Sequence, residues 1–182
     1  MKTVFPGRFQ PFHSGHHKVI EKYREKYDLT LVIGSADKSR TEKNPLTAEE
    51  REKIIRECYP EIEILHLEDT ERTEDGNREW IHEVEEKAEA EKIITQNELV
   101  KKLAESHTDL EIIEQQLFDE EIYSGTEIRR RIRSGSEWRY LVPDCAVEMI
   151  DRMEDTIKKS GIQYEFEPGW KKENAFHGTT DN

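Results

Sequence analysis

Short apolar runs alternate along the chain with longer stretches in which apolar residues recur every three or four positions. The short runs, rich in Val, Ile, Leu and Phe, predict β-strands at residues 2–5, 29–33, 62–67, 92–95 and 110–113. The longer stretches predict helices at residues 15–27, 47–59, 77–90, 97–105, 124–133 and 144–159. This alternation favours a parallel sheet covered by helices, a three-layer α/β fold with a small helical part at its C-terminal end.

Cap and turn signals set the expected boundaries of these elements. Thr47 and Glu50 have the spacing of a capping box, and Asn77 and Asp144 are expected to cap the helices that follow them. Residues 68–76 predict a charged loop. We expect one domain of ordinary size over residues 1–160, followed by an extended or disordered tail over residues 161–182.

Charge is the most unusual part of the composition. The chain has 182 residues, with 28 Lys and Arg against 41 Asp and Glu, and its net charge is −13. This balance argues against a general surface that binds nucleic acid or anionic membranes. A phosphate-bearing ligand would need a local cluster of basic side chains. Because 38% of the residues are charged, we expect a heavily ionic surface.

The cysteines and the apolar runs bear on where the protein works. Cys58 and Cys145 lie outside any Cys-x-x-Cys pattern and among apolar neighbours in predicted helices, so we expect two reduced, buried thiols and no disulfide. No apolar run is long enough to cross a bilayer, and the first residues lack the features of a signal peptide. The expectation is a soluble, cytoplasmic protein.

Two histidines lie where the first predicted strand passes into the first predicted helix. His13 precedes the helix, and His16 opens an inward stripe that continues through Val19, Ile20 and Tyr23. A helix N-terminus presents free backbone N–H groups and the positive end of the helix dipole, so this junction is a place for phosphate. The alternatives are a capping or surface role for either histidine, and a zinc site, for which nothing nearby supplies a third ligand.

Other residues of this junction fit a phosphate site as well. Gly7 and Arg8 come directly after the strand, and Gly15 leaves room for a phosphate to approach the backbone. His17 is turned about 100° from His16 on the helix, so we expect it to meet water.

A second candidate site lies at the start of the predicted helix over residues 124–133. Ser124, Thr126 and the free N–H groups of the first turn would surround an anion, with Arg129 closing from the side. The alternative is an arginine-rich helix face in solvent, and we favour that interpretation for the three other arginines, Arg130, Arg131 and Arg133.

Three further positions have both a structural and a functional interpretation. Arg51 stands at the edge of the buried stripe of its helix, either as a side chain that snorkels to water or as a functional guanidinium. Gly34 and Ser35 end the second strand, where ligands of open α/β sheets collect, although such a pair is often only a turn. Trp80 is either a core residue or a flat face for a stacked ring.

The junction sequence Gly-Arg-Phe-Gln-Pro-Phe-His-x-Gly-His at residues 7–16 resembles the signature of the nucleotidyltransferase superfamily with His-x-Gly-His motifs. Its extended form is similar to that of the archaeal nicotinamide-nucleotide adenylyltransferases. Ser-x-Thr-x-x-Arg at residues 124–129 matches the second signature of this superfamily. The resemblance covers about the first 155 residues and implies a Rossmann-like fold and transfer of the adenylyl group of ATP to nicotinamide mononucleotide (NMN), giving NAD and pyrophosphate.

The resemblance also implies roles for the candidate residues. His13 and His16 would donate hydrogen bonds to the triphosphate during in-line attack without a covalent intermediate. Arg129, Ser124 and Thr126 would hold the β- and γ-phosphates. Arg8 and Arg51 would steady phosphates of either nucleotide, and the remaining contacts to the nucleotides would come from Gly7, Phe9, Gly15, Gly34, Ser35, Trp80 and Asn97.

Partners follow from the same resemblance. Mg²⁺ would arrive with ATP and be held by the triphosphate and water, without a protein cage. The archaeal relatives form hexamers, so a homo-oligomer is expected. The relatives place an Asp near the matching Trp, and either Asp69 or Asp75 could correspond to it.

This chain departs from the family pattern at two places. Asn97 is followed by Glu98 where the relatives usually have Pro, and residues 119–121 are acidic where the relatives tend to carry Arg. The acidic run either faces solvent or means a changed substrate or a weakened triphosphate site. Two alternative functions stay open. One is a sister nucleotidyltransferase with another acceptor, such as pantetheine phosphate, FMN or a cytidylyl acceptor, and the other, suggested by the acidic run, is a nucleotide-binding module without catalysis.

Overall fold

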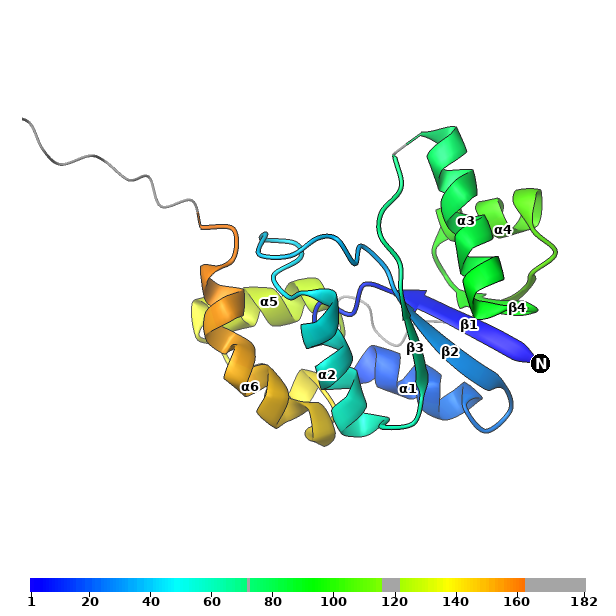
Figure 1. Cartoon of the computed structure of the whole chain (residues 1–182). Helices are drawn as coiled ribbons and strands as arrows, with labels where there is room; N and C mark the ends of the chain where they lie inside the picture. The colour runs from blue at the N-terminus through cyan, green and yellow to red at the C-terminus, as the bar shows by residue number, and fades with distance from the viewer. Residues whose placement is uncertain (72, 116–121, 163–182) are drawn as a thin grey trace, which may run out of the picture.

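The strand β1 (Lys2–Gly7) lies at the centre of the sheet in the computed structural model, which describes residues 1–71, 73–115 and 122–162. In this part of the chain the sheet has five parallel strands in the order β3-β2-β1-β4-β5 (Figure 1). The other strands are β2 (Asp28–Ile33), β3 (Glu63–His66), β4 (Lys92–Thr95) and β5 (Glu111–Glu114). The expected parallel α/β sheet is confirmed.

Helices cover both faces of the sheet, as Figure 1 shows. One face carries α1 (Ser14–Tyr23), α2 (Ala48–Cys58), α5 (Gly125–Ser134) and α6 (Asp144–Lys159), and the other carries α3 (Glu74–Ala88) and α4 (Glu98–His107). Successive strand residues point to opposite faces. Accordingly, Phe5 and Ile94 belong to the core under the first group, whereas Val4 and Ile93 belong to the core under the second.

Several predicted boundaries are confirmed. The Thr47 side chain accepts the Glu50 N–H in a capping box at the start of α2. The fourth strand has the predicted bounds, and Asn97 caps α4 by accepting the N–H groups of Leu99 and Val100.

Two predicted caps are wrong. The α3 helix begins earlier than expected because Thr73 accepts the Gly76 N–H, so Asn77 lies inside the helix and part of the predicted loop is helical. At the start of α6 the cap position belongs to Pro143, and Asp144 is the first helical residue. The predicted tail begins at residue 161, and its residues 163–182 lie outside the described part of the chain, as do the acidic residues 119–121.

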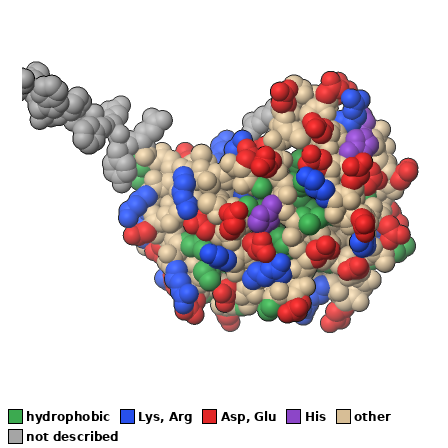
Figure 2. All heavy atoms as spheres, viewed as in Figure 1, with side chains coloured by type: hydrophobic (Ala, Val, Ile, Leu, Met, Phe, Trp, Pro, Cys, Tyr) green, Lys and Arg blue, Asp and Glu red, His purple; other side chains and the backbone are tan. Residues whose placement is uncertain are grey.

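The surface is as ionic as the composition predicts. In Figure 2, acidic and basic side chains are interspersed over the visible face. Several of the ion pairs join two exposed side chains, as between Arg78 and Asp75 or Lys159 and Asp155, and such pairs contribute little to stability one by one. Across the described ranges, none of the helices combines the length and the apolar character needed to cross a bilayer.

The expectation of two reduced, buried thiols is wrong. Cys58 at the end of α2 and Cys145 in the first turn of α6 form a disulfide, although 87 positions separate them in the sequence. Their Cα atoms lie 5.3 Å apart because the two helices pack side by side. Cys145 is exposed, and Cys58 is half-buried. No local pattern could predict the pairing, since it depends on helix packing.

Removing this disulfide should destabilise the protein. A cross-link between residues so distant in sequence restricts the unfolded chain, so the double variant Cys58→Ser with Cys145→Ser should lose roughly 2–5 kcal/mol of unfolding free energy. Denaturant titration of the wild type with and without dithiothreitol measures the same difference. The double variant is the control, because its transition should not respond to dithiothreitol. An unfolding transition of the wild type that is the same with and without dithiothreitol would contradict a stabilising role for the disulfide.

Candidate active site

A cavity of about 280 Å³ lies at the carboxyl ends of β1 and β4. The strand order reverses between these two strands, and open α/β sheets bind ligands at such a point. Of the predicted site residues, His16 and Asn97 line this cavity. The other lining residues are uncharged: Phe5, Pro6, Thr95, Gln96 and Gln115.

The two histidines are linked by their positions at the start of α1. His13 is the N-cap, and its Nδ1 accepts the Gly15 N–H at 3.1 Å. His16 reaches back, and its Nδ1 accepts the His13 N–H at 3.3 Å. The rings stack with their centroids 3.7 Å apart. His13 therefore has the capping role that the sequence offered as an alternative, and this role aligns it with His16.

This geometry determines the protonation of both rings. Burial lowers the pKa of His13 to about 4. Burial, and to a smaller extent the neighbouring His13, holds the pKa of His16 well below its usual range. Both imidazoles are thus neutral near pH 7. Since each Nδ1 accepts a hydrogen bond, the proton of each ring belongs on Nε2, and each ring presents one N–H donor.

Aromatic residues hold the His16 ring from behind. Phe9 lies 4.6 Å from it, and Phe12 stacks on it at 5.8 Å, measured between ring centroids. Both phenylalanines are buried, so the Phe9 side chain belongs to the core. A Cβ on Gly7 would lie 2.9 Å from the Phe9 ring, and Gly7 therefore leaves the space that this ring occupies.

The surroundings of Gly15 and His17 in the structure differ from those predicted from the sequence. A Cβ at Gly15 would lie 2.9 Å from the His13 ring, so the imidazole occupies the space that was predicted for a phosphate. The prediction that His17 meets water is wrong in part. It is half-buried, and its Nδ1 lies 2.6 Å from the hydroxyl oxygen of Tyr59.

A second cavity, of about 660 Å³, lies along α5, from its first turn to its last. Arg8, Thr126 and Arg129 line it, as the phosphate interpretation predicts, together with Glu42, Lys43, Arg130, Arg133 and Ser134. Ser124 caps α5 by accepting the Glu127 N–H. Burial, then the nearby Arg8 and Arg133, lower the pKa of Arg129 to about 10. An anion here would relieve the repulsion among these guanidinium groups.

The three arginines that follow Arg129 on α5 have different contacts. Arg130 and Arg131 pair with Glu127 on the helix surface, in agreement with the solvent interpretation. Arg133 meets that interpretation only in part, because it is half-buried and its Nη2 donates to the Glu42 carbonyl at 2.8 Å. Both Arg130 and Arg133 line the second cavity.

The starts of α1 and α5 lie close together. Arg129 Nη1 donates to the Gln10 carbonyl at 2.6 Å, three residues before His13. A Cβ at Gly15 would lie 3.5 Å from the Tyr123 carbonyl, which directly precedes Ser124. The two motifs are therefore parts of one region, although more than 100 positions separate them in the sequence.

Arg51 is a buried arginine that binds backbone carbonyls. It is fully buried, and its guanidinium donates to the carbonyls of Arg8, Gly34, Ser35 and Thr47 at 2.7–3.1 Å. Burial is the main reason that the pKa of Arg51 falls to about 10. The side chain thus holds the loops after β1 and β2 together, and neither the snorkelling interpretation nor a free phosphate ligand describes this arrangement.

The ends of β2 and β3 also meet near the site. Ser35 has a left-handed backbone, with φ of 48°, and its Oγ donates to Asp69 at 2.7 Å. Asp75 instead pairs with Arg78 in α3. Asp69 is therefore the aspartate beside the Gly34–Ser35 turn. Trp80 packs half-buried against the core of the α3 face and does not line either cavity.

Sequence reasoning missed several residues of this region. Thr95 and Gln115 follow or end strands, so the rule that located Gly34 and Ser35 could have found them. Lys43 comes from a loop with no motif of its own. Among the residues that the structure describes, no group of three or more His, Cys, Asp or Glu side chains could hold a metal ion.

The buried, neutral His13 makes stability depend on pH. Between pH 6.5 and 4 His13 binds a proton in the unfolded chain but stays neutral in the folded protein. The unfolding free energy therefore falls as pH falls. This loss should be roughly 2–4 kcal/mol. His13→Gln should show a shallower decline between pH 7.5 and 4 in denaturant titrations. Parallel curves for the two proteins would contradict the low pKa.

Comparisons with known proteins agree with this fold and show the family of the chain. A family model described as cytidylyltransferase-like matches residues 4–131. A nicotinamide-nucleotide adenylyltransferase of Haloarcula marismortui is 36% identical over 159 residues, covering 84% of this chain and 82% of the relative. One from Methanosarcina barkeri is 35% identical, covering 88% of this chain and 94% of the relative.

A solved structure adds support for the fold alone. The bifunctional NMN adenylyltransferase/ADP ribose pyrophosphatase of Francisella tularensis, complexed with AMP and a manganese ion, superposes with a TM-score of 0.68 at 20% identity. The match covers 87% of this chain and 51% of the Francisella chain, so the present chain spans about half of that protein. Sequence, fold and paired motifs thus agree, and the chain belongs to the cytidylyltransferase-like family and, within it, to the nicotinamide-nucleotide adenylyltransferases.

Proposed function

We propose that this protein transfers the adenylyl group of ATP to NMN, forming NAD and releasing pyrophosphate. The observation that carries the proposal is the pair of neutral imidazoles at the start of α1, each with a proton on Nε2, beside the arginine-lined cavity along α5. The relatives that cover most of the chain support NMN as the acceptor.

In this mechanism a phosphate oxygen of NMN attacks the α-phosphorus of ATP directly. The new oxygen–phosphorus bond forms as the bond to the bridging oxygen breaks, and that oxygen leaves with pyrophosphate. No enzyme nucleophile takes part. The work of the chain is orientation and charge stabilisation, since it holds two anionic substrates in line and offers donors to the charge that develops.

Each group of residues has a role in this proposal. His13 and His16 donate through Nε2 to the triphosphate, while Arg8, Ser124, Thr126 and Arg129 bind its β- and γ-phosphates. ATP enters as its Mg²⁺ complex, with the ion held by phosphate oxygens and water. Gly34, Ser35, Trp80 and Asn97 contact the nucleosides, and Gly7, Phe9, Gly15 and Arg51 act by positioning the loops and rings around them.

The acceptor is tested with a pyrophosphate-release assay. ATP is supplied with NMN, its acid analogue, FMN or 4′-phosphopantetheine in turn, and CTP replaces ATP in a parallel series. Release with ATP and NMN is expected. Release with another acceptor only would identify a sister transferase. Tight NAD binding in calorimetry without release in any mixture would identify a binding module. Homo-oligomeric assembly and a cytoplasmic location remain predictions.

His16→Ala should lower kcat by about 100- to 1,000-fold, because it removes one preorganised donor from the developing charge. The fold should persist, since the variant leaves the His13 cap in place. His82→Ala is the matched control, because His82 lies half-buried on α3, outside both cavities. Steady-state kinetics with circular dichroism measure both effects. Wild-type kcat in His16→Ala would remove His16 from catalysis.

A further inference from the structure

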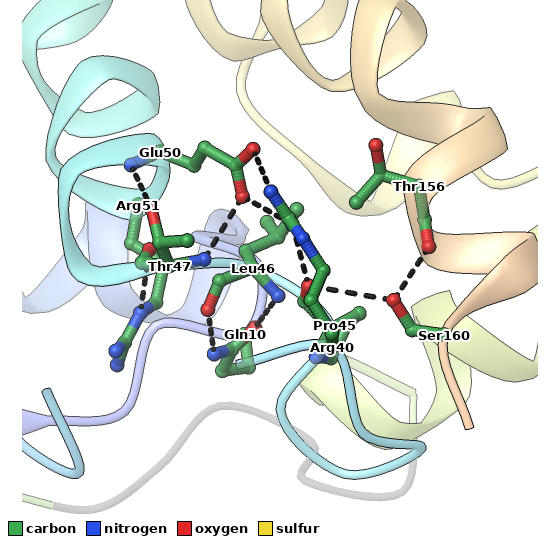
Figure 3. A network of polar contacts seen from close by, with 9 residues as sticks. All are labelled: Gln10, Arg40, Pro45, Leu46, Thr47, Glu50, Arg51, Thr156 and Ser160. Atoms are coloured by element: carbon green, nitrogen blue, oxygen red, sulfur yellow. Dashed lines mark hydrogen bonds and ion pairs between the residues drawn. The ribbon is translucent and has the colours of Figure 1, made fainter. Parts of the chain in front are cut away.

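The side chain of Gln10 joins two separate parts of the chain. It is buried with 3% of its surface exposed. Its Nε2 donates to the Leu46 carbonyl at 2.8 Å, and its Oε1 accepts the Leu46 N–H at 3.1 Å, as Figure 3 shows. This pairing uses both backbone groups of Leu46 in the way that a neighbouring strand would. The loop that ends at Leu46 is therefore fastened to the residues between β1 and α1.

The backbone of Gln10 fastens a third segment. Its carbonyl oxygen accepts the hydrogen bond from Arg129 Nη1, and a Cβ on Gly125 would lie only 2.5 Å from that oxygen. The start of α5 can come this close because Gly125 has no side chain. A single residue thus sets the position of Arg129 and of the loop before α2.

That loop forms a wall of the arginine-lined cavity. Glu42 and Lys43 line the cavity together with Arg8, Arg129 and Arg133. The Arg133 guanidinium also holds the loop from the α5 side, through its hydrogen bond to the Glu42 carbonyl. The position of residues 40–46 therefore decides the width of the cavity and the place of the Lys43 charge.

The C-terminal end of α6 supports the opposite side of the same loop. Ser160 Oγ lies 3.4 Å from the Pro45 carbonyl, and Arg40 braces the loop by donating to that carbonyl and to Glu50 (Figure 3). Gly161 has a φ of 83°, and a Cβ there would lie 2.6 Å from the Glu42 nitrogen. Backbone meets backbone at this point, so a larger residue must displace the loop.

We propose that Gln10 and Gly161 are positioning residues that hold residues 40–46 from two sides and thereby set the affinity of the cavity for the triphosphate of ATP. This inference rests on the proposed function for its choice of ligand. Neither residue contacts the substrate in this account. The end of α6, far from both motifs in the sequence, then contributes to nucleotide binding through the loop alone.

The first variant is Gln10→Met, which keeps the volume of the side chain and removes both hydrogen bonds to Leu46. It should raise KM for ATP about tenfold, because the loop that carries Lys43 loses its attachment to the start of α1 and α5. KM for NMN should stay within about twofold, because none of residues 40–46 lines the cavity at the ends of β1 and β4. A merely destabilising change would not separate the two substrates, provided the assay runs well below the melting temperature.

The second test is a matched pair of glycine substitutions. Gly161→Ala and Gly135→Ala both place alanine in a left-handed conformation, since φ at Gly135 is 69°. A Cβ on Gly135 meets nothing within 4 Å, whereas one on Gly161 meets the Glu42 backbone. Gly161→Ala should raise KM for ATP at least about threefold, and Gly135→Ala should leave it unchanged. If Gln10→Met fails to fold, this pair decides alone.

Calorimetric titration with ATP separates this inference from the proposed function. If the wild type binds ATP but releases no pyrophosphate with any acceptor, the proposed transfer is wrong, and the Kd values of the same variants still test the positioning. The inference is overturned if ATP affinity is unchanged in Gln10→Met and Gly161→Ala. It is also overturned if both glycine variants weaken ATP binding equally, or if both KM values rise together.

Discussion

The N–H groups at the start of α1 orient the imidazoles of His13 and His16, and the chemistry proposed for the protein depends on this arrangement. Each Nδ1 accepts a backbone N–H, which leaves the ring proton on Nε2. Burial keeps both rings neutral, so each offers one donor and no net charge. In the proposed reaction the two rings would then act as a pair of donors that needs no rearrangement when charge develops on phosphate.

The same region gathers basic side chains in a protein that is acidic overall. The net charge is −13, yet Arg8, Lys43, Arg129, Arg130 and Arg133 line one cavity. Carboxylates elsewhere pair with surface lysines and arginines at helix spacing. Arg129 is buried among other guanidinium groups, which raises its free energy without a ligand and strengthens its attraction to phosphate. Local placement of charge thus outweighs the overall balance.

Buried polar side chains, more than apolar ones, determine how the loops of the site meet. Arg51 holds the loops after β1 and β2 through four backbone carbonyls. Gln10 holds the loop before α2 through both backbone groups of Leu46. Loops lack the regular backbone hydrogen bonds of helices and strands. Their buried carbonyl and N–H groups therefore need side-chain partners. These side chains take the place of strand pairing where the sheet has ended.

Local sequence determined the strands, most helix boundaries and the two motifs, because periodicity and capping depend on residues a few positions apart. The start of α3 was missed, since Thr73 and Asn77 are both good caps and only packing selects one. Arg51, His17 and Arg133 were assigned by helix face alone, yet their partners come from other elements. The Cys58–Cys145 disulfide and the contact of Gly161 with Glu42 arise only when α6 packs beside α2. Long-range contacts of this kind are set by tertiary packing, which no short stretch of sequence encodes.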